Sequence, residues 1–127
     1  MISVLGCSVP QAKEVDVSKL PPPSNQQGVT YDNDIKPILD QSCVKCHSGK
    51  KPKAKLSLDS LANVLKGGVD GKVIEPGNSA KSMLIINVAH LGDKDEWMPP
   101  PKNKLKIKEL TPEQIGTLRA WVDQGAK

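Results

Sequence analysis

Aromatic residues are almost absent from this chain of 127 residues, which contains no phenylalanine, two tryptophans and one tyrosine. A globular core normally takes much of its bulk from aromatic side chains. We therefore expect either an aliphatic core or a core filled by a group that is not an amino acid. Long apolar runs are also missing, and none approaches the ~20 residues that a membrane-spanning helix needs.

Arginine occurs once, at Arg119, so lysine supplies nearly all the basic groups behind the net charge of +4. Because arginine is the residue favoured for bidentate phosphate contacts, this composition argues against nucleic-acid binding. The lysines gather in two stretches, which form either solvated loops or a docking face for an acidic protein partner. These stretches hold Lys45, Lys50, Lys51, Lys53 and Lys55, and Lys102, Lys104, Lys106 and Lys108.

The length suits one domain preceded by a tether. Three consecutive prolines, Pro21–Pro23, and the polar residues after them predict that residues 1–29 form a disordered leader, and that the folded domain covers residues 30–127. Residues 2–8 resemble the end of a bacterial lipoprotein signal peptide, in which Cys7 would be the lipid-modified cysteine. An ordinary free cysteine in a tail is the alternative.

The folded domain is predicted to be all-α, with about four short helices joined by long loops rich in proline and glycine. A short or kinked first helix should end around Cys43, and Thr30, Asp32, Asn33 and Asp34 offer several N-caps and acids for its first turn. A second helix, capped by Ser57 or Asp59, should stop at Gly67-Gly68. A third helix should run from a cap at Asn78 or Ser79 through residues 83–88, with Met83 as a buried filler of the core.

The last helix carries the strongest signals. Thr111 is an N-cap, Pro112 occupies the first helical position and Gln114 completes a capping box. Gly125 is typical of a helix stop.

Cys43-Val44-Lys45-Cys46-His47 is the pattern Cys-x-x-Cys-His, which is typical of covalent haem attachment. Two thiols at this spacing on one helical turn can add to the two vinyl groups on one edge of a porphyrin. The adjacent histidine then reaches the iron with Nε2. The sequence therefore predicts one haem c, with Cys43 and Cys46 as thioether residues and His47 as the proximal ligand.

Two other chemistries use cysteine pairs. A thioredoxin-like redox pair requires a βαβ setting, and the sequence shows no strands. A structural zinc site needs four ligands, and beyond the motif the folded domain adds only His90 and carboxylates. Both fit this chain less well than haem attachment.

The second axial position of the iron has four candidates: Met83, His90, Met98 and Cys7. Cys7 would have to fold back from the tether, and Met83 is expected in the core. Three prolines follow Met98 and restrict its backbone, so this loop can hold a thioether at little further entropic cost. A loop methionine without a ligand role is the alternative at that position, and His90 would give a bis-histidine site.

The order of helix, Cys-x-x-Cys-His, loops, Met-Pro and C-terminal helix resembles a class I c-type cytochrome, and within that class the planctomycete-type cytochrome c domain. The resemblance covers residues 30–126, roughly the whole predicted domain. The matching stretches are residues 34–39, 43–47, 56–59, 65–68, 75–78, 82–85, 98–100 and 110–125.

This resemblance implies a fold wrapped around one covalent haem, with Met98 as the distal ligand and His90 as the alternative. It also implies export, because haem is attached outside the cytoplasm, and hence a periplasmic or outer-face, membrane-anchored bacterial protein. The expected function is one-electron transfer between redox partner proteins. A haem-based sensor or small-ligand binder with an open sixth position is the runner-up. A peroxidase would need a distal acid–base group, for which only His90 is present.

Overall fold

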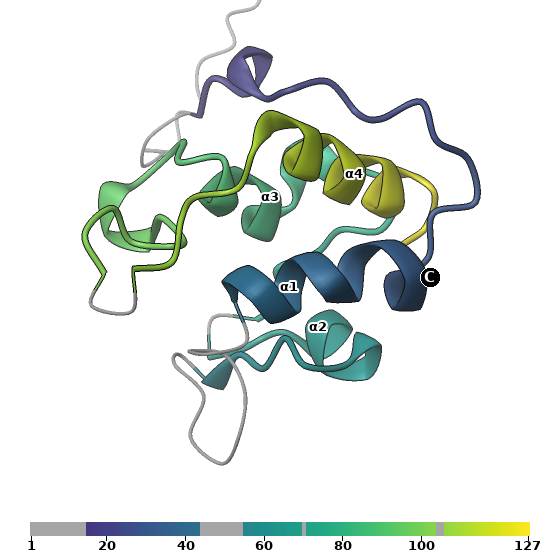
Figure 1. The fold of residues 1–127 in the computed structure, drawn as a ribbon, viewed down its shortest axis with the longest axis horizontal. Helices are drawn as coiled ribbons and strands as arrows, with labels where there is room; N and C mark the ends of the chain where they lie inside the picture. The colour runs from purple at the N-terminus through teal and green to yellow at the C-terminus, as the bar shows by residue number, and fades with distance from the viewer. Residues whose placement is uncertain (1–14, 44–54, 70, 104–105) are drawn as a thin grey trace, which may run out of the picture.

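The structure is a computed structural model that describes residues 15–43, 55–69, 71–103 and 106–127 (Figure 1). These residues form helices and loops with no β-strand among them, as the predicted all-α class requires. Within this part of the chain no helix is both long enough and apolar enough to cross a membrane.

The first helical unit consists of a π-helical turn, η2 (Tyr31–Ile35), that continues into α1 (Lys36–Ser42). The hydroxyl of Thr30 caps it by accepting a hydrogen bond from the backbone N–H of Asn33 at 3.3 Å. Pro37 lies in the first turn of α1, where a missing N–H leaves no helical bond unmade. The predicted helix that ends near Cys43 is confirmed, and Thr30 is the N-cap among the candidates that the sequence offers.

Helix α2 (Leu61–Lys66) begins later than predicted, because its N-cap is Ser60 and neither Ser57 nor Asp59. The Asp59 carboxylate is engaged elsewhere: it accepts hydrogen bonds from the Ser57 hydroxyl at 2.6 Å and the Asn63 amide at 3.0 Å. The helix stops at Gly67, with φ at 85°, where any side chain would collide with the backbone of Gly71.

The predicted third helix is divided into a short 3-10 turn, η4 (Ser79–Lys81), and α3 (Met83–Val88). Ser82 separates them in an extended conformation, and its hydroxyl accepts from the N–H of Glu75 at 2.8 Å and donates to the carbonyl of Asn78 at 3.1 Å. The prediction for Met83 is wrong: its side chain is 46% exposed. Met83 starts α3 on the outer side, and the buried residues of the helix begin at Leu84.

Helix α4 (Pro112–Asp123) follows a short 3-10 turn, η5 (Lys94–Glu96), and a long loop. Its predicted capping box is confirmed: Thr111 Oγ1 accepts from the N–H of Gln114 at 3.1 Å, and Gln114 Oε1 accepts from the N–H of Thr111 at 2.9 Å. The helix packs against η2, η4 and α3, so it lies at the centre of the described fold.

The core of the described residues is aliphatic apart from two aromatic residues, which is one of the two alternatives that the composition allows. Trp121 on α4 is completely buried, and its ring centroid lies 6.1 Å from that of Tyr31. The other large, fully buried side chains come from η2, the four α-helices and the loop before α2: Ile35, Leu39, Leu58, Val64, Leu84, Ile85, Val88, Leu118 and Val122.

Residues 16–29, which we call the N-terminal strap, run along α4 (Figure 1). The strap contains one 3-10 turn, η1 (Val17–Lys19), and buries Leu20 and Val29. Its hydrogen bonds to α4 include Ser24 N–H to the carbonyl of Gly116 at 2.9 Å. This packing differs from the disordered tether expected over residues 1–29. Residues 1–14, with Cys7, lie outside the described residues.

Candidate functional site

Cys43, the first residue of the Cys-x-x-Cys-His motif, lies at the C-terminal end of α1. Its N–H donates to the carbonyl of Leu39 at 2.8 Å, and only 4% of its surface is exposed. Cys46 and His47 lie outside the described residues. The structure therefore fixes the start of the motif against the aliphatic core, at the end of a helix that is itself held by that core.

Met98 lies in the loop that follows η5, partly buried against the core. Its N–H donates to the carbonyl oxygen of Asn87 at 3.1 Å, in the last turn of α3. The final carbonyl groups of a helix lack partners within the helix, so this bond satisfies one of them. It also joins the backbone of Met98 directly to the end of α3.

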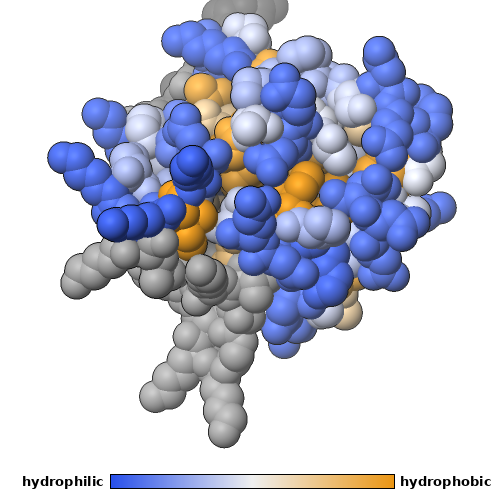
Figure 2. All heavy atoms as spheres, viewed as in Figure 1, coloured by the Kyte–Doolittle hydropathy of each residue, from blue (hydrophilic) through white to orange (hydrophobic). Residues whose placement is uncertain are grey.

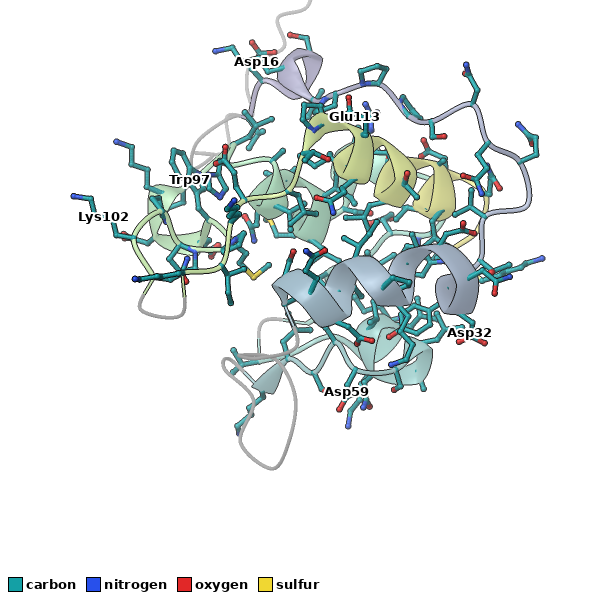
Figure 3. All side chains as sticks on the ribbon, viewed as in Figure 1. Asp16, Asp32, Asp59, Trp97, Lys102 and Glu113 are labelled. Carbon is teal, nitrogen blue, oxygen red and sulfur yellow. The ribbon has the colours of Figure 1, made fainter. Side chains whose placement is uncertain are left out.

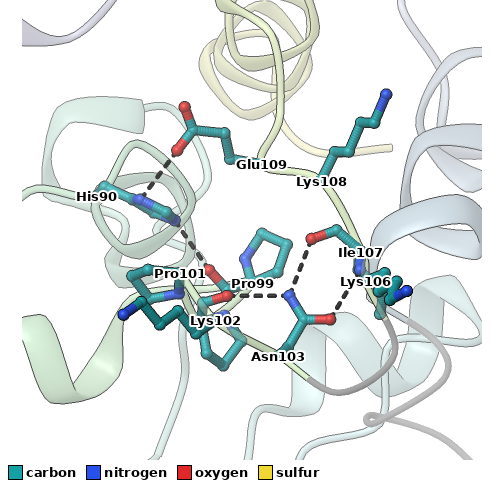
Figure 4. Close-up of a pocket in the computed structure, with 10 residues that line it drawn as sticks. His90, Pro99, Pro101, Lys102, Asn103, Lys106, Ile107, Lys108 and Glu109 are labelled. Atoms are coloured by element: carbon teal, nitrogen blue, oxygen red, sulfur yellow. Dashed lines mark hydrogen bonds and ion pairs between the residues drawn. The ribbon is translucent and has the colours of Figure 1, made fainter.

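His90 lies two residues beyond α3, where its φ of 56° turns the chain away from the helix. Its Nε2 is 3.0 Å from the carbonyl oxygen of Pro99, and its Nδ1 is 3.2 Å from a carboxylate oxygen of Glu109 (Figure 4). Only 14% of the side chain is exposed. Since both ring nitrogens have partners, His90 could bind iron only after one of these contacts was broken.

Two residues that the sequence did not single out as functional also support this loop. The indole of Trp97 stacks on the imidazole of His90, with centroids 4.8 Å apart and planes 9° from parallel. Asn103 donates from Nδ2 to the carbonyls of Pro100 and Ile107, both at 2.9 Å, and accepts from the Ile107 N–H at 2.7 Å. In the sequence, only their position next to Met98 and the three prolines could have indicated a role for these two residues.

Two cavities border the segment 106–109. The larger, about 580 Å³, is lined by this segment, by His90 and by residues 99–103 (Figure 4). The second, about 430 Å³, lies between the same segment, the start of α4 and two residues of α1, Gln41 and Ser42. Space is thus present both beside the Met98 loop and beside the end of α1 that leads to Cys43.

A haem fits this set of residues. A buried thiol at Cys43 and a thioether at Met98 are the soft sulfur groups that covalent haem and its iron use, and both lie next to the aliphatic core. Among the described residues no three His, Cys, Asp or Glu side chains gather into a metal-binding cluster. Cys46 as a thioether residue and His47 as the proximal ligand stay predictions, because both lie outside the described residues.

The described residues form a small helical fold that is consistent with a cytochrome c-like protein. The family model described as Planctomycete cytochrome C matches residues 43–102, from the first cysteine of the motif to the loop beyond Met98. This match supports a planctomycete-type cytochrome c domain over these residues. No curated protein and no solved structure matches the chain.

A cytochrome c domain implies haem c as the cofactor and electron transport as the general role. The match supports an electron carrier rather than an enzyme. It covers less of the chain than the resemblance over residues 30–126, since it ends before α4.

Proposed function

We propose that this protein is a single-haem c-type cytochrome that carries one electron at a time between redox partner proteins. Bound haem supplies an iron that accepts one electron and gives it back without making or breaking a bond in a substrate. The observation that carries the proposal is the family match, which begins at Cys43, the first thiol of the attachment motif.

In this proposal Cys43 and Cys46 hold the haem through two thioether bonds, and His47 is the proximal ligand. Met98 is the distal ligand. Its partial burial and its backbone bond to Asn87 support this role, because a fixed loop loses little entropy when its thioether binds iron. The contacts of both ring nitrogens of His90 favour Met98 over His90.

Met98→Ala, with Met83→Ala as the matched control, tests the distal ligand. Met83 is the exposed methionine of α3, so its removal should leave the spectrum unchanged. Met98→Ala should remove the far-red methionine-to-iron band of the oxidised protein. It should also lower the reduction potential by on the order of 0.1 V, within the ~0.8 V range that axial ligands span.

The same variants separate the proposal from a haem-based sensor or small-ligand binder. If the sixth position is open, the wild-type ferrous protein should bind carbon monoxide readily, and Met98→Ala should change nothing. If Met98 closes it, only Met98→Ala should bind carbon monoxide readily. Covalent attachment is tested by the pyridine haemochrome spectrum and by the mass of exported protein, and the lack of a haem-sized increment would contradict it.

We further propose that the protein works outside the cytoplasm, in the periplasm or on the outer face of a membrane, with a lipid anchor at Cys7. The lysines of the loop after Met98 would bind an acidic redox partner protein. Lys102, Lys106 and Lys108 are exposed, and hydrophilic residues cover most of the face in Figure 2. Charge steering suits such a surface better than a large apolar contact.

A further inference from the structure

We propose that His90 is a positioning residue for Met98, which acts by holding the carbonyl group of the next residue, Pro99. The inference rests on the proposed ligation by Met98. It adds a role for a histidine that the electron-carrier function itself does not use.

The backbones of His90 and Met98 are both hydrogen-bonded to one carbonyl group, that of Asn87. The oxygen of Asn87 accepts from the N–H of His90 and from the N–H of Met98, each at 3.1 Å. His90 and Met98 are thus fixed to the same point at the end of α3, although they are eight residues apart. The imidazole then spans the remaining gap to Pro99.

The direction of the side-chain bond follows from its partners. A carbonyl oxygen only accepts, so the ring donates from Nε2 to Pro99, at 3.0 Å. The Glu109 carboxylate faces the opposite nitrogen, Nδ1, at 3.2 Å. The two contacts fix the orientation of the ring, because a ring flip would place carbon atoms where Nδ1 and Nε2 now face Glu109 and Pro99.

The faces of the ring are constrained as well. Trp97, the residue before Met98, stacks on the imidazole, and its Nε1–H donates to the carbonyl of Leu91 at 3.2 Å. Residues on both sides of Met98 are therefore attached to His90: Trp97 by stacking and Pro99 by a hydrogen bond. Figure 3 shows Trp97 on the loop that follows α3, on the same side of the molecule as Lys102.

Holding both neighbours of a ligand reduces the freedom of the loop before the ligand binds, which strengthens the bond to iron. A hydrogen bond of this kind is worth about 0.5 to 1.5 kcal/mol net, so its loss should weaken the methionine ligation about two- to tenfold. The effect should be seen most clearly in oxidised protein, since the soft thioether favours Fe(II).

The test compares His90→Asn with His90→Gln in the haem-loaded protein, using imidazole as the competing ligand. The amide nitrogen of glutamine can take the place of Nε2 and donate to Pro99, whereas asparagine is too short. Asparagine tolerates the positive φ at position 90, so the backbone strain of the shorter variant is small. Urea unfolding of each variant checks that the fold is intact.

We expect oxidised His90→Asn to bind imidazole about two- to tenfold more tightly than wild type, with a weaker methionine-to-iron band. His90→Gln should restore both towards wild-type values. Wild-type imidazole affinity in His90→Asn would overturn the proposal, and so would equal effects in the two variants, because the bond to Pro99 would then not matter.

Met98→Ala distinguishes failure of this inference from failure of the proposed function. If Met98→Ala abolishes the far-red band and His90→Asn leaves it intact, Met98 is the ligand and His90 does not position it. If Met98→Ala itself leaves the band unchanged, the ligation fails and this inference fails with it.

Discussion

Arg119 on α4 donates a hydrogen bond from Nη1 to the carbonyl oxygen of Pro21 at 2.7 Å, joining residues 98 positions apart. The same guanidinium donates from Nε to the hydroxyl of Ser79 at 2.9 Å. Near the other end of α4, Gln124 donates to the carbonyl of Gln26 at 2.8 Å and accepts from the N–H of Val29 at 3.1 Å. The N-terminal strap is therefore fastened along the length of the C-terminal helix.

Gly116→Ala should detach the strap. Position 116 lies within α4, where alanine would normally stabilise a helix by about 1 kcal/mol. Here the added Cβ would come within 2.7 Å of the carbonyl oxygen of Pro22. Since overpacking of this kind costs about 1 to 3 kcal/mol, the gain is cancelled or outweighed, and we expect a net loss of about 0 to 2 kcal/mol in the free energy of unfolding, measured with urea.

Thr117→Ala is the control, because it also places alanine on α4 but removes atoms instead of adding a Cβ; it loses only the hydrogen bond from its hydroxyl to the carbonyl of Glu113. It should be neutral or slightly stabilising. If Gly116→Ala were as stable as Thr117→Ala, that result would contradict the close packing of the Pro22 carbonyl of the strap against Gly116.

Thr111→Ala should remove the N-terminal cap of α4. The capping box satisfies the N–H groups of Thr111 and Gln114 reciprocally, and loss of a threonine cap costs about 1 kcal/mol. We expect a corresponding drop in urea stability and a lower melting temperature. Gln114→Ala should cost less, because it leaves the Thr111 hydroxyl in place; equal stability of Thr111→Ala and wild type would contradict a working cap.

The helix boundaries were predictable because their signals are local. The capping box of α4 and the cap of η2 at Thr30 each depend on residues within four positions of one another. The strap was missed for the opposite reason: Arg119 and Gln124 bind it through the backbone carbonyls of Pro21 and Gln26, and any residue carries a backbone carbonyl. Nothing in residues 16–29 marks them as packed rather than extended and free.

The candidate site also contains a part that adjacent residues reveal and a part that depends on residues far apart in the sequence. The motif at Cys43 needs only adjacent residues, so the sequence reveals it completely. The surroundings of Met98 depend on contacts of His90 with Pro99 and with Glu109, which lie nine and nineteen positions away. The burial of Met83 was predicted wrongly because its apolar neighbours, which are buried, suggest a core position for it too. The pattern does not show that the first residue of α3 faces the solvent.

Ser57→Ala should raise the pKa of Asp59. In the folded protein the pKa of the Asp59 carboxyl is held below its ordinary value, first by the hydrogen bond from Ser57 and then by that from Asn63, with a smaller contribution from the charge of Lys36. A carboxyl with a lowered folded pKa stabilises the protein above its unfolded pKa. That stabilisation is lost as the pH falls below about 4 and through the folded value.

NMR titration of the Asp59 carboxyl should therefore show the pKa rising most in Ser57→Ala, less in Asn63→Ala and least in Lys36→Ala. Urea midpoints between pH 5 and pH 2 should fall less steeply in Ser57→Ala than in wild type. A different order of the three variants would contradict the causes named here.

Charge reversal at Lys102, Lys106 and Lys108 should change the rate of electron transfer in opposite directions for oxidants of opposite charge. If electrons leave near the loop after Met98, these exposed lysines attract an anionic oxidant such as ferricyanide and repel a cationic cobalt complex. The triple glutamate variant should therefore react more slowly with ferricyanide and faster with the cobalt complex. A matched variant with glutamate at Lys66, Lys72 and Lys81, which are exposed elsewhere on the protein, has the same net charge.

Stopped-flow rates should change much less in that control variant than in the variant of the loop after Met98. Both effects should shrink as salt shortens the Debye length from about 30 Å at 0.01 M to about 10 Å at 0.1 M. Equal changes in the two triple variants would mean that net charge alone, and not this loop, governs the encounter.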